Sequence, residues 1–428
     1  MNKSIKIDLP YRIEQRYILP SPEKFLDKIS CYLERKLFSN NEYVHTIYFN
    51  NDEHTVPFEF SIKARKYLSH PSNPVLNNDL YFLDLKRGKG EDKEKIRLQM
   101  PLKEIINFIN KTYHFSKIPL RPYIAVEYLR WHYVPKKTTN IRLTLDTNLK
   151  YFFFPQNQKE AVEIGKENYA RVEIKEAALN LSLSEKIKEV LKEAGAFPTI
   201  SKKFTAYNLL GLYRAKTFGK PFYKELRGYE IESKLETGDE KVFQKAKCLF
   251  DNKNLDFRLP SHFPYTLESA SLNKYYQDDQ GLFKAIFRGS EVEIVRKGDA
   301  EIIKDPFGLN CLLKRKEIKG HIVSVDSKII TSAKLRGELY RMRKAFWVEN
   351  PKTRRFYHIS LDCSLGSPGI LYEMEVEYTG RYTNTESTPE TTKEEEIIKD
   401  ITRITKTLLE KFPELKPSQL TKQDWLGI

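Results

Sequence analysis

The sequence is poor in cysteine and histidine and has no long apolar run. Its 428 residues include 4 cysteines and 8 histidines. There is no Cys-x-x-Cys pair and no His-x-x-x-His pattern, so neither a disulfide framework nor a zinc site is expected. No apolar run approaches the roughly 20 residues of a membrane-spanning helix, and the N-terminal segment MNKSIKIDLP lacks the apolar core of a signal peptide. These absences favour a soluble, cytoplasmic protein without a membrane span.

The chain is long, basic and rich in aromatic residues. A length of 428 residues suggests two domains of about 200 residues each. Tyrosine and phenylalanine, 25 of each, favour strands over a helical bundle. The net charge of +15 implies a polyanionic partner, which could be nucleic acid, a phosphate chain or a nucleotide. The positions of the basic residues must decide between these partners.

Several segments of the first half alternate with a period of two between apolar and charged residues. On a strand, alternate residues share one face, so each segment would have an apolar face and a face with charges of both signs. Singly, each could be a sheet with one solvated face. Together they favour a closed barrel with a charged interior, covered outside by helices and loops. The charged rows are Lys63, Arg65 and Tyr67; Asp84 and Lys86; Lys95 and Arg97; Arg142, Thr144 and Asp146; and Arg171, Glu173 and Lys175.

The most informative segment is Tyr-Glu-Ile-Glu-Ser-Lys-Leu at residues 229–235. On a strand it places Glu230, Glu232 and Lys234 on one face. Such a row is costly to bury without a metal and a highly charged ligand. A related row, Arg12, Glu14 and Arg16, lies about 218 residues earlier, which suggests two barrels in tandem.

The Glu-x-Glu-x-Lys spacing resembles the signature of CYTH domains in the triphosphate tunnel metalloenzyme superfamily. The first half resembles the VTC domain, the polyphosphate-polymerase branch of that superfamily. The segments that carry this second resemblance are 12–16, 44–50, 63–67, 84–87, 95–97, 121–122, 128–130, 142–146, 173–175 and 201–202.

The resemblance implies an α+β chain with two tandem antiparallel β-barrel domains and flanking helices. The predicted domains are 1–218 and 222–428, joined by a connector at 215–224 that contains Gly219 and Pro221. Helices are expected from Pro22, with Ser21 as N-cap, and by apolar spacing at 101–113, 183–194, 239–251 and 393–411.

Phosphoryl transfer needs cations on the phosphate oxygens and a metal held by carboxylates. In the first half, Glu173 with Glu14 would hold Mg²⁺ or Mn²⁺, which prefer oxygen ligands. By resemblance, Ser201 and Lys202 belong to a helix that closes one end of the tunnel. The predicted catalytic residues are Arg65, Arg130, Glu173 and Lys202, and the predicted substrate-binding residues are Arg12, Arg16, Lys63, Tyr67, Lys86, Lys95, Arg97, Tyr128, Arg142, Lys175 and Ser201.

The second half combines an acidic and a basic set. The acidic set would hold one or two divalent metals, and the basic set would bind phosphates. The predicted metal ligands are Glu230, Glu232, Asp362, Glu373 and Glu375; the predicted catalytic cations are Lys234, Arg341 and Arg343; and Lys297, Lys314 and Lys316 are predicted to bind substrate.

These resemblances imply metal-dependent phosphoryl transfer. The VTC-like half would act as a polymerase that transfers the γ-phosphate of ATP, or of another nucleoside triphosphate, onto a polyphosphate chain. The CYTH-like half would hydrolyse tripolyphosphate or a nucleotide. An RNA 5′-triphosphatase, a nucleotide cyclase and a non-catalytic polyphosphate or nucleotide sensor stay open as alternatives. Nucleic acid is expected only as a 5′-triphosphate substrate, because a plain nucleic-acid binder would place its basic residues on an outer face beside aromatic platforms.

Overall fold

The computed structural model divides the chain into two compact units, residues 1–210 with 288–290 and residues 211–287 with 291–428. The division falls within a helix, and most of the predicted connector at 215–224 lies outside the described residues. The described residues are 5–6, 12–36, 43–71, 74, 76–88, 94–136, 141–156, 158–177, 181–218, 228–251, 255–261, 266–288, 291–305, 307–323, 328–381 and 394–428.

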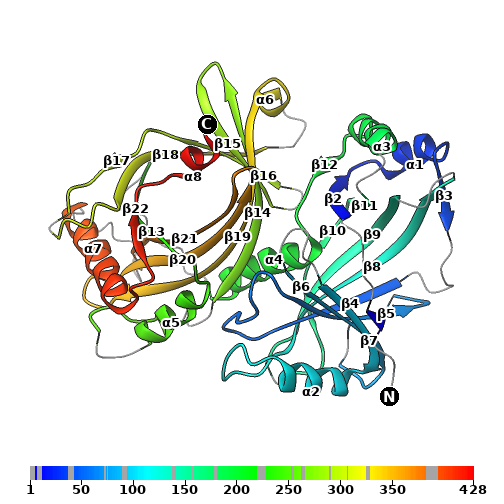
Figure 1. The fold of residues 1–428 in the computed structure, drawn as a ribbon, viewed down its shortest axis with the longest axis horizontal. Helices are drawn as coiled ribbons and strands as arrows, with labels where there is room; N and C mark the ends of the chain where they lie inside the picture. Colours follow the sequence, from blue (N-terminus) through cyan, green and yellow to red (C-terminus); the bar gives the residue numbers. More distant parts are fainter. Residues whose placement is uncertain are drawn as a thin grey trace. The chain divides into compact units, whose positions relative to one another are not determined.

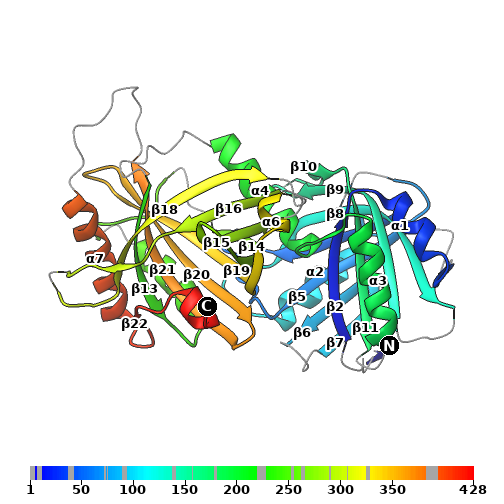
Figure 2. The same cartoon turned by 90° about the horizontal axis from the view of Figure 1, so that it is seen from above.

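The first unit is an antiparallel sheet with helices on its outer side (Figures 1 and 2). Its strands are β1 (Ile5–Lys6), β2 (Arg12–Leu19), β3 (Leu33–Lys36), β4 (Tyr43–Asn50), β5 (Ser61–Leu68), β6 (Leu80–Arg87), β7 (Glu94–Pro101), β8 (Arg121–Pro135), β9 (Ile141–Phe153), β10 (Val162–Glu167), β11 (Ala170–Ala177) and β12 (Phe197–Pro198). Its helices are α1 (Pro22–Ile29), α2 (Leu102–Thr112), α3 (Leu181–Glu193) and α4 (Lys202–Phe218).

The strand order of this sheet is β1-β7-β6-β5-β4-β8-β9-β11-β2-β12, with β10 beside β9 and β3 beside β8. β1, at one end of the sheet, and β2, next to the other end, are successive strands of the chain, so the sheet curls round. β1 pairs with β7 and the next strand, β2, pairs with β11.

The second unit is a closed barrel. Its strands are β13 (Tyr229–Glu236), β14 (Leu267–Asp278), β15 (Gly281–Arg288), β16 (Glu291–Lys297), β17 (Glu301–Ile302), β18 (Leu312–Val323), β19 (Lys334–Asn350), β20 (Arg355–Gly366), β21 (Gly369–Arg381) and β22 (Lys416–Ser418). Its helices are α5 (Lys241–Phe250), α6 (Lys328–Thr331), α7 (Glu394–Lys411) and α8 (Lys422–Leu426). The order is β17-β18-β16-β15-β14-β19-β20-β21-β13-β22, and β13 also pairs with β18, which closes the ring.

The two units repeat one strand order. Starting from its first long strand, the first unit runs β2-β11-β9-β8-β4-β5-β6-β7 and the second runs β13-β21-β20-β19-β14-β15-β16-β18. In both, the first strand pairs with the last long strand of its unit and also with a short strand that precedes a helix, β12 before α4 and β22 before α8. The predicted α+β fold with two antiparallel barrels and flanking helices is therefore confirmed.

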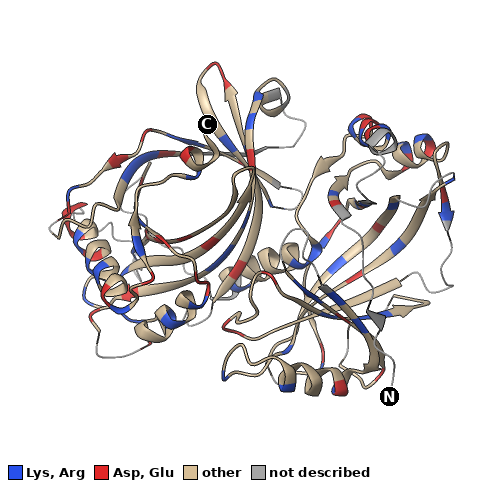
Figure 3. Ribbon diagram, in the orientation of Figure 1, with Lys and Arg blue, Asp and Glu red and all other residues tan. Residues whose placement is uncertain are grey.

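The apolar faces of the sheets lie outside, under the helices. In the first unit, α1 and α3 place Phe25, Ile29 and Ile187 in one cluster with Leu145 and Ile174 of the sheet. α2 covers a second part of the sheet in the same way. In the second unit, the buried face of α7 packs on β21 and β13. The charged rows are left to face the interior, and Figure 3 shows charged residues along the strands as well as on the helices.

The helices begin close to where the sequence predicts. α1 starts at Pro22, whose fixed φ suits a first helical turn, although the Ser21 side chain makes no capping hydrogen bond. α2, α3, α5 and α7 overlap the other predicted segments. Among the described residues, no helix is long and apolar enough to cross a membrane.

The outer apolar face gives a stability prediction. Ile174→Ala should lower the free energy of unfolding by about 2–4 kcal/mol, because Ile174 is 1% exposed within the cluster under α1 and α3. Ile96→Ala is the matched control, since Ile96 is 38% exposed, and should cost less than about 1 kcal/mol. Denaturant unfolding measures both; equal losses would show that the Ile174 face is not the buried one.

Candidate functional site

The interior of the first unit is formed by charged rows brought together by strand register. Arg16 on β2 is opposite Glu173 on β11, and Lys175 is opposite Glu14. Arg16 lies 2.8 Å from Glu14, and Lys175 contacts both Glu14, at 3.6 Å, and Glu173. Burial would raise the pKa of Glu173, but Lys175 and nearby cations outweigh it and hold that pKa well below its ordinary value.

Asp146 on β9 is the fully buried carboxylate of this interior. Arg130 on β8 donates two hydrogen bonds to it, at 2.6 and 2.7 Å, a bidentate geometry that is stronger than a single bond. Lys202, the first residue of α4, also contacts Asp146 and lies 3.9 Å from Glu173. Burial would raise the pKa of Asp146, yet Arg130 and Lys202 keep it below its ordinary value.

Asp84 on β6 is a second cluster centre. Arg97 on β7 binds it at 2.7 and 3.1 Å, with Arg65 at 3.7 Å and Lys95 at 3.8 Å. Arg65 also donates to the Tyr67 hydroxyl at 3.4 Å. Burial raises the pKa of Asp84, but these cations more than offset that effect.

Two lysines of the same interior are only partly offset by carboxylates in the described part of the chain. The effect of burial outweighs the charge of Asp84 near Lys63 and the charges of Glu14 and Glu173 near Lys86. Burial, reinforced for Lys63 by Arg65 and Lys86, lowers the pKa of both lysines, and burial lowers the pKa of Lys95 to about 8. Such groups are held at a cost that a bound anion would remove.

Cations therefore outnumber carboxylates in the described interior of the first unit. The cations are Arg16, Lys63, Arg65, Lys86, Lys95, Arg97, Arg130, Arg142, Arg171, Lys175 and Lys202, and the carboxylates are Glu14, Asp84, Asp146, Glu173 and Glu167, which pairs with Arg171. The predicted residues Tyr128 and Ser201 lie with them: Arg130 and Lys202 are each 4.9 Å from the Tyr128 ring centre, and the Ser201 hydroxyl accepts from the Phe204 amide at the start of α4. The side chain of Arg12 lies outside the described residues.

The second unit brings together the predicted metal ligands Asp362, Glu373 and Glu375. They are buried, and one oxygen of each lies within 4.8 Å of the others, because Asp362 on β20 is the register partner of Glu373 on β21. Carboxylate oxygens are the donors that Mg²⁺ and Mn²⁺ prefer. The donor set therefore fits a divalent metal.

Cations of the chain itself already contact all of these carboxylates. Lys234 lies 3.1 Å from both Glu373 and Glu375. Lys422, from α8, lies 3.0 Å from Asp362 and 2.7 Å from Glu375 and also contacts Glu373. The remaining predicted cations contact Asp362, Arg343 through two hydrogen bonds and Arg341 at 3.8 Å.

Glu230 and Glu232 form a second acidic cluster on β13, which Lys234 links to the first because its ammonium lies 3.8 Å from Glu232. Lys297 and Arg315 each lie 2.6 Å from Glu230, and Arg315 also binds Glu232. Burial raises the pKa of Glu232 although Arg315 opposes it. Glu377 is a further acidic residue of this cluster that is not among the predicted site residues. Burial and the charges of Glu230 and Glu232 raise its pKa to about 7.

The predicted interior position of Lys314 is wrong, and Lys316 also faces outward but lines the cavity described below. Register pairs Glu230 with Arg315, so Arg315 faces inward and its two neighbours face outward. Lys314 binds Glu394 of α7 at 2.7 and 2.9 Å, and Lys316 is exposed. Because Lys314, Arg315 and Lys316 are all basic, the sequence does not show which of them faces inward.

Lys422 and Lys284 are further interior cations that sequence reasoning missed. Burial and the charge of Lys297 hold the pKa of Lys284 well below its ordinary value. In the described interior of the second unit, cations and carboxylates are equal in number. The cations are Lys234, Lys284, Lys297, Arg315, Arg341, Arg343 and Lys422, and the carboxylates are Glu230, Glu232, Glu317, Asp362, Glu373, Glu375 and Glu377.

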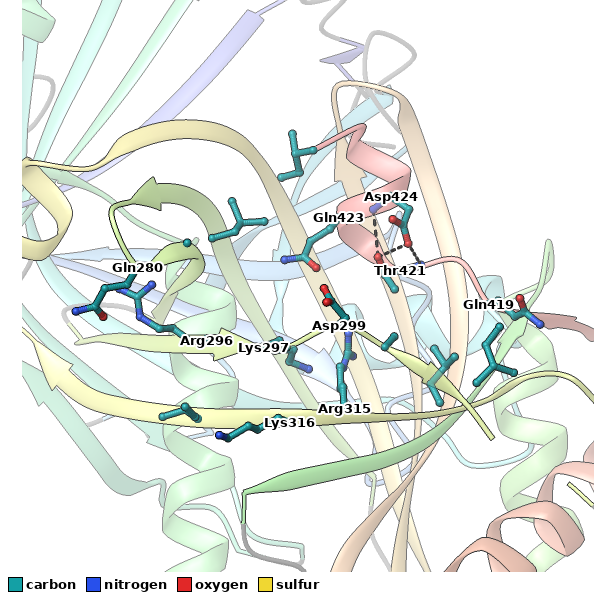
Figure 4. A pocket seen from close by; sticks show the side chains of 18 residues that line it. Gln280, Arg296, Lys297, Asp299, Arg315, Lys316, Gln419, Thr421, Gln423 and Asp424 are labelled. Carbon is teal, nitrogen blue, oxygen red and sulfur yellow. Dashed lines mark hydrogen bonds between the residues drawn. The ribbon is translucent and has the colours of Figure 1, made fainter. Parts of the chain in front are cut away.

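A cavity of about 740 Å³ opens beside α8 in the second unit (Figure 4). Its walls come from β15, β16, β18 and the C-terminal segment. Arg296, Lys297 and Arg315 line one side, and Thr421 and Gln423 line the other. Asp299 and Asp424 also line the cavity, so its basic surface is confined to the side formed by Lys297 and Arg315, which both bind Glu230.

The same ion-pair arrangement occurs in both units. An arginine binds an aspartate with two hydrogen bonds across a strand pair, and a lysine at the start of a later helix binds the same aspartate. The triplets are Arg130, Asp146 and Lys202 in the first unit and Arg343, Asp362 and Lys422 in the second. Ser201-Lys202 and Thr421-Lys422 are the sequence signal that could have revealed Lys422.

Register also shows where the units differ. Arg171 is opposite Asp146 as Glu373 is opposite Asp362, and two residues further Glu173 corresponds to Glu375. Lys175 then corresponds to Glu377. The first unit has a cation at two positions where the second has a carboxylate, which accounts for part of the charge difference.

Comparison with known proteins gives one family match, the VTC domain, over residues 115–210. No curated protein matches the chain. The chain is similar to a solved structure of a candidate adenylate cyclase from Vibrio parahaemolyticus, with 11% identity, 47% of this chain and 98% of that chain covered, and a TM-score of 0.30. It is also similar to the S. pombe Pct1 RNA triphosphatase, with 13% identity, coverage of 42% and 80%, and a TM-score of 0.24. At these scores neither likeness carries an argument.

Asp146 gives a prediction that separates buried from exposed ion pairs. Asp146→Asn should lower the free energy of unfolding by about 3–5 kcal/mol, because Arg130 and Lys202 lose the charge that offsets theirs. Asp79→Asn is the matched control: Asp79 pairs with Lys66 but is 43% exposed, and its loss should cost at most about 1 kcal/mol.

The same comparison has a pH dependence. The pKa of Asp146 is lowered in the folded state, so its contribution should be complete above pH of about 4 and decline as the pH falls through the folded-state pKa. Denaturant unfolding at several pH values measures this. A constant difference between the wild type and Asp146→Asn down to strongly acidic pH would contradict the assignment.

Proposed function

We propose that this protein carries out metal-dependent phosphoryl transfer on triphosphates and polyphosphate. The first unit would be a polymerase that extends a phosphate chain from ATP or another nucleoside triphosphate, and the second a triphosphatase. The observation that carries the proposal is the excess of buried cations over carboxylates in the first interior. A linear polyanion has the charge density to offset it. The VTC match spans β8 to α4, which supply Arg130, Asp146, Glu173 and Lys202.

In the first unit, the terminal oxygen of a phosphate chain would attack the γ-phosphorus of the nucleotide. One P–O bond forms, the bond from that phosphorus to the β-phosphate oxygen breaks, and the nucleoside diphosphate leaves with the electron pair. Arg65 and Arg130 would bind non-bridging oxygens through paired N–H groups, and Lys63, Lys86 and Lys202 would act as point charges. Positioning and charge neutralisation of this kind account for most of the catalysis of phosphoryl transfer.

Glu173 and Glu14 are the residues that would hold the metal of the first unit. Lys175 contacts both Glu14 and Glu173, so the two carboxylates lie beside one ammonium. A bound Mg²⁺ or Mn²⁺ would supply further neutralisation of phosphate charge. Lys175 and Lys202, which both lie near Glu173, would orient the phosphates beside it.

In the second unit, a water oxygen would attack the terminal phosphorus of tripolyphosphate or a nucleotide. The bridging P–O bond breaks, and orthophosphate and the shortened product leave with release of the water proton. Asp362, Glu373 and Glu375 would hold the metal, and Lys297 and Arg315 would bind phosphate at the cavity.

A sensor function is the second candidate for the second unit. The observation that favours it is the equal number of cations and carboxylates in the described interior, which gives a bound polyanion less to neutralise than in the first unit. RNA 5′-triphosphatase and nucleotide cyclase activities are distinguished by product: a shortened 5′ end on RNA, or a cyclic nucleotide.

Separate carboxylates should control the two activities. With ATP and Mn²⁺, Glu173→Gln should abolish polyphosphate formation and leave phosphate release from tripolyphosphate, whereas Glu375→Gln should do the reverse, because each removes one ligand charge of one metal site. Glu163→Gln on β10, an exposed position, should change neither activity. Gel analysis of polyphosphate and a phosphate-release assay measure the two products.

The outcomes separate enzyme from sensor. If the wild type forms neither polyphosphate nor orthophosphate with any divalent metal but binds tripolyphosphate tightly, the chain is a sensor. If Glu173→Gln removes both activities together, the two units do not work independently.

Ligand binding should also take up protons near pH 8. The pKa of Lys95 is about 8 because the side chain is buried, so about half of Lys95 is neutral at that pH. A bound polyphosphate favours the charged form and raises the pKa, and the part of the uptake that comes from Lys95 should vanish toward pH 6, where this lysine is already charged. The pKa values of Lys63 and Lys86 are also lowered, and Lys95→Arg leaves their uptake in place. Calorimetry of tripolyphosphate binding in two buffers of different ionisation enthalpy measures the uptake. Lys95→Arg, which stays charged, should reduce it; unchanged uptake would place Lys95 away from the ligand.

A further inference from the structure

α8 is a short helix whose start is firmly fixed. The Thr421 hydroxyl accepts from the Asp424 amide at 3.1 Å, and the Asp424 carboxylate accepts from the Thr421 amide at 3.1 Å. This reciprocal capping box makes Lys422 the first helical residue.

The apolar side of α8 packs closely on two barrel strands. A Cβ placed at Gly366 of β20 would lie 2.9 Å from both Trp425 and Leu426, and one at Gly337 of β19 would lie 3.4 Å from Ile428. At Gly366 a larger residue would force the Trp425 and Leu426 side chains to shift, whereas the approach at Gly337 is an ordinary van der Waals contact. These contacts hold α8 against the barrel strands while Lys422 reaches the carboxylates.

The Lys422 ammonium lies among Asp362, Glu373 and Glu375, the same three carboxylates that fit a metal. The Lys422 side chain is 11% exposed, so its charge needs these partners. An ammonium and a divalent cation a few ångströms apart in a poorly screened interior repel strongly. Lys422 contacts all three carboxylates, whereas Lys234 contacts Glu373 and Glu375 and Arg343 contacts Asp362 and Glu375. Lys422 is therefore the cation whose place a metal held by all three carboxylates would take.

We propose that α8 is a latch: Lys422 holds the carboxylates of the second unit with the chain's own cation, and a divalent metal enters only as α8 withdraws. The proposal rests on the proposed function for its assignment of these carboxylates as a metal site. Thr421 and Gln423 of the same segment line the cavity, so withdrawal of α8 would also widen the route by which a phosphate ligand reaches the interior. Metal loading and ligand access are thereby coupled through one helix.

The test compares Mn²⁺ binding to full-length wild type, Lys422→Met and Lys416→Met. Lys416 is exposed on β22, just before α8, and serves as the matched control. Lys422→Met should bind one additional Mn²⁺, or bind it about tenfold more tightly or better, a coupling of the usual size between mutually exclusive ligands. Electron paramagnetic resonance of free Mn²⁺ measures the stoichiometry, and Asp362→Asn combined with Lys422→Met should abolish the gain.

Each outcome bears on one proposal. If Lys422→Met and the wild type bind Mn²⁺ equally at the Asp362-dependent site, the latch is wrong and the metal site stands. If neither protein has an Asp362-dependent site, the carboxylates are not a metal site and the proposed activity of the second unit fails as well. If Lys422→Met is too unstable to measure, Gly366→Leu displaces α8 while keeping the lysine, and it should show the same gain; no gain in that variant overturns the latch.

The wild type should reveal the latch through its helix. In a variant with Trp131→Phe and Trp347→Phe, Trp425 is the one remaining tryptophan, and its fluorescence reports the contact of α8 with Gly366. Saturating Mn²⁺ with tripolyphosphate should make Trp425 more accessible to acrylamide. Unchanged quenching with metal bound at the Asp362-dependent site would contradict withdrawal.

Discussion

A charge buried inside a β-barrel must be offset by another charge, and this constraint shapes both units. Both units contain the same buried ion pair, in which an arginine binds an aspartate by two hydrogen bonds across neighbouring strands. The pairs are Arg130 with Asp146 and Arg343 with Asp362. Each pair is costly to desolvate, and loss of one partner leaves a buried unpaired charge that strongly destabilises the folded protein. The pair therefore fixes which side chains of its two strands face the interior. The other inward-facing side chains of these strands follow from the alternation of faces along each strand.

The units differ in what offsets the remaining charges. In the first, Lys63 and Lys86 are buried among other cations, so the described interior is suited to a ligand of opposite charge. In the second, internal partners serve this purpose, with Lys234 and Lys422 among the acidic residues. The same fold thus gives one interior with an excess of buried positive charge, which a bound anion would offset, and another in which residues of the chain itself offset nearly all of the buried charges.

The fold and the first interior could be predicted from sequence because period-two alternation is a property of neighbouring residues. Arg65, Arg130 and Asp146 lie in such rows, and strand register brings the rows together. Lys314 was placed on the wrong face because three successive basic residues give no parity signal; only the partner strand, through Glu230 and Arg315, determines it. Lys422 could not be assigned from alternation at all, since it lies on a short helix that reaches the interior through tertiary packing.

The repeated strand order has a consequence for the origin of the chain. Two barrels with one circular order, each followed by a short strand and a lysine-bearing helix, are what tandem duplication of an ancestral single barrel would leave. The two interiors differ by sign reversals at register-equivalent positions, such as Lys175 against Glu377. One strand order therefore supports two ion balances, because a sign reversal at an inward position changes the charge of the interior and leaves the apolar packing under the helices in place.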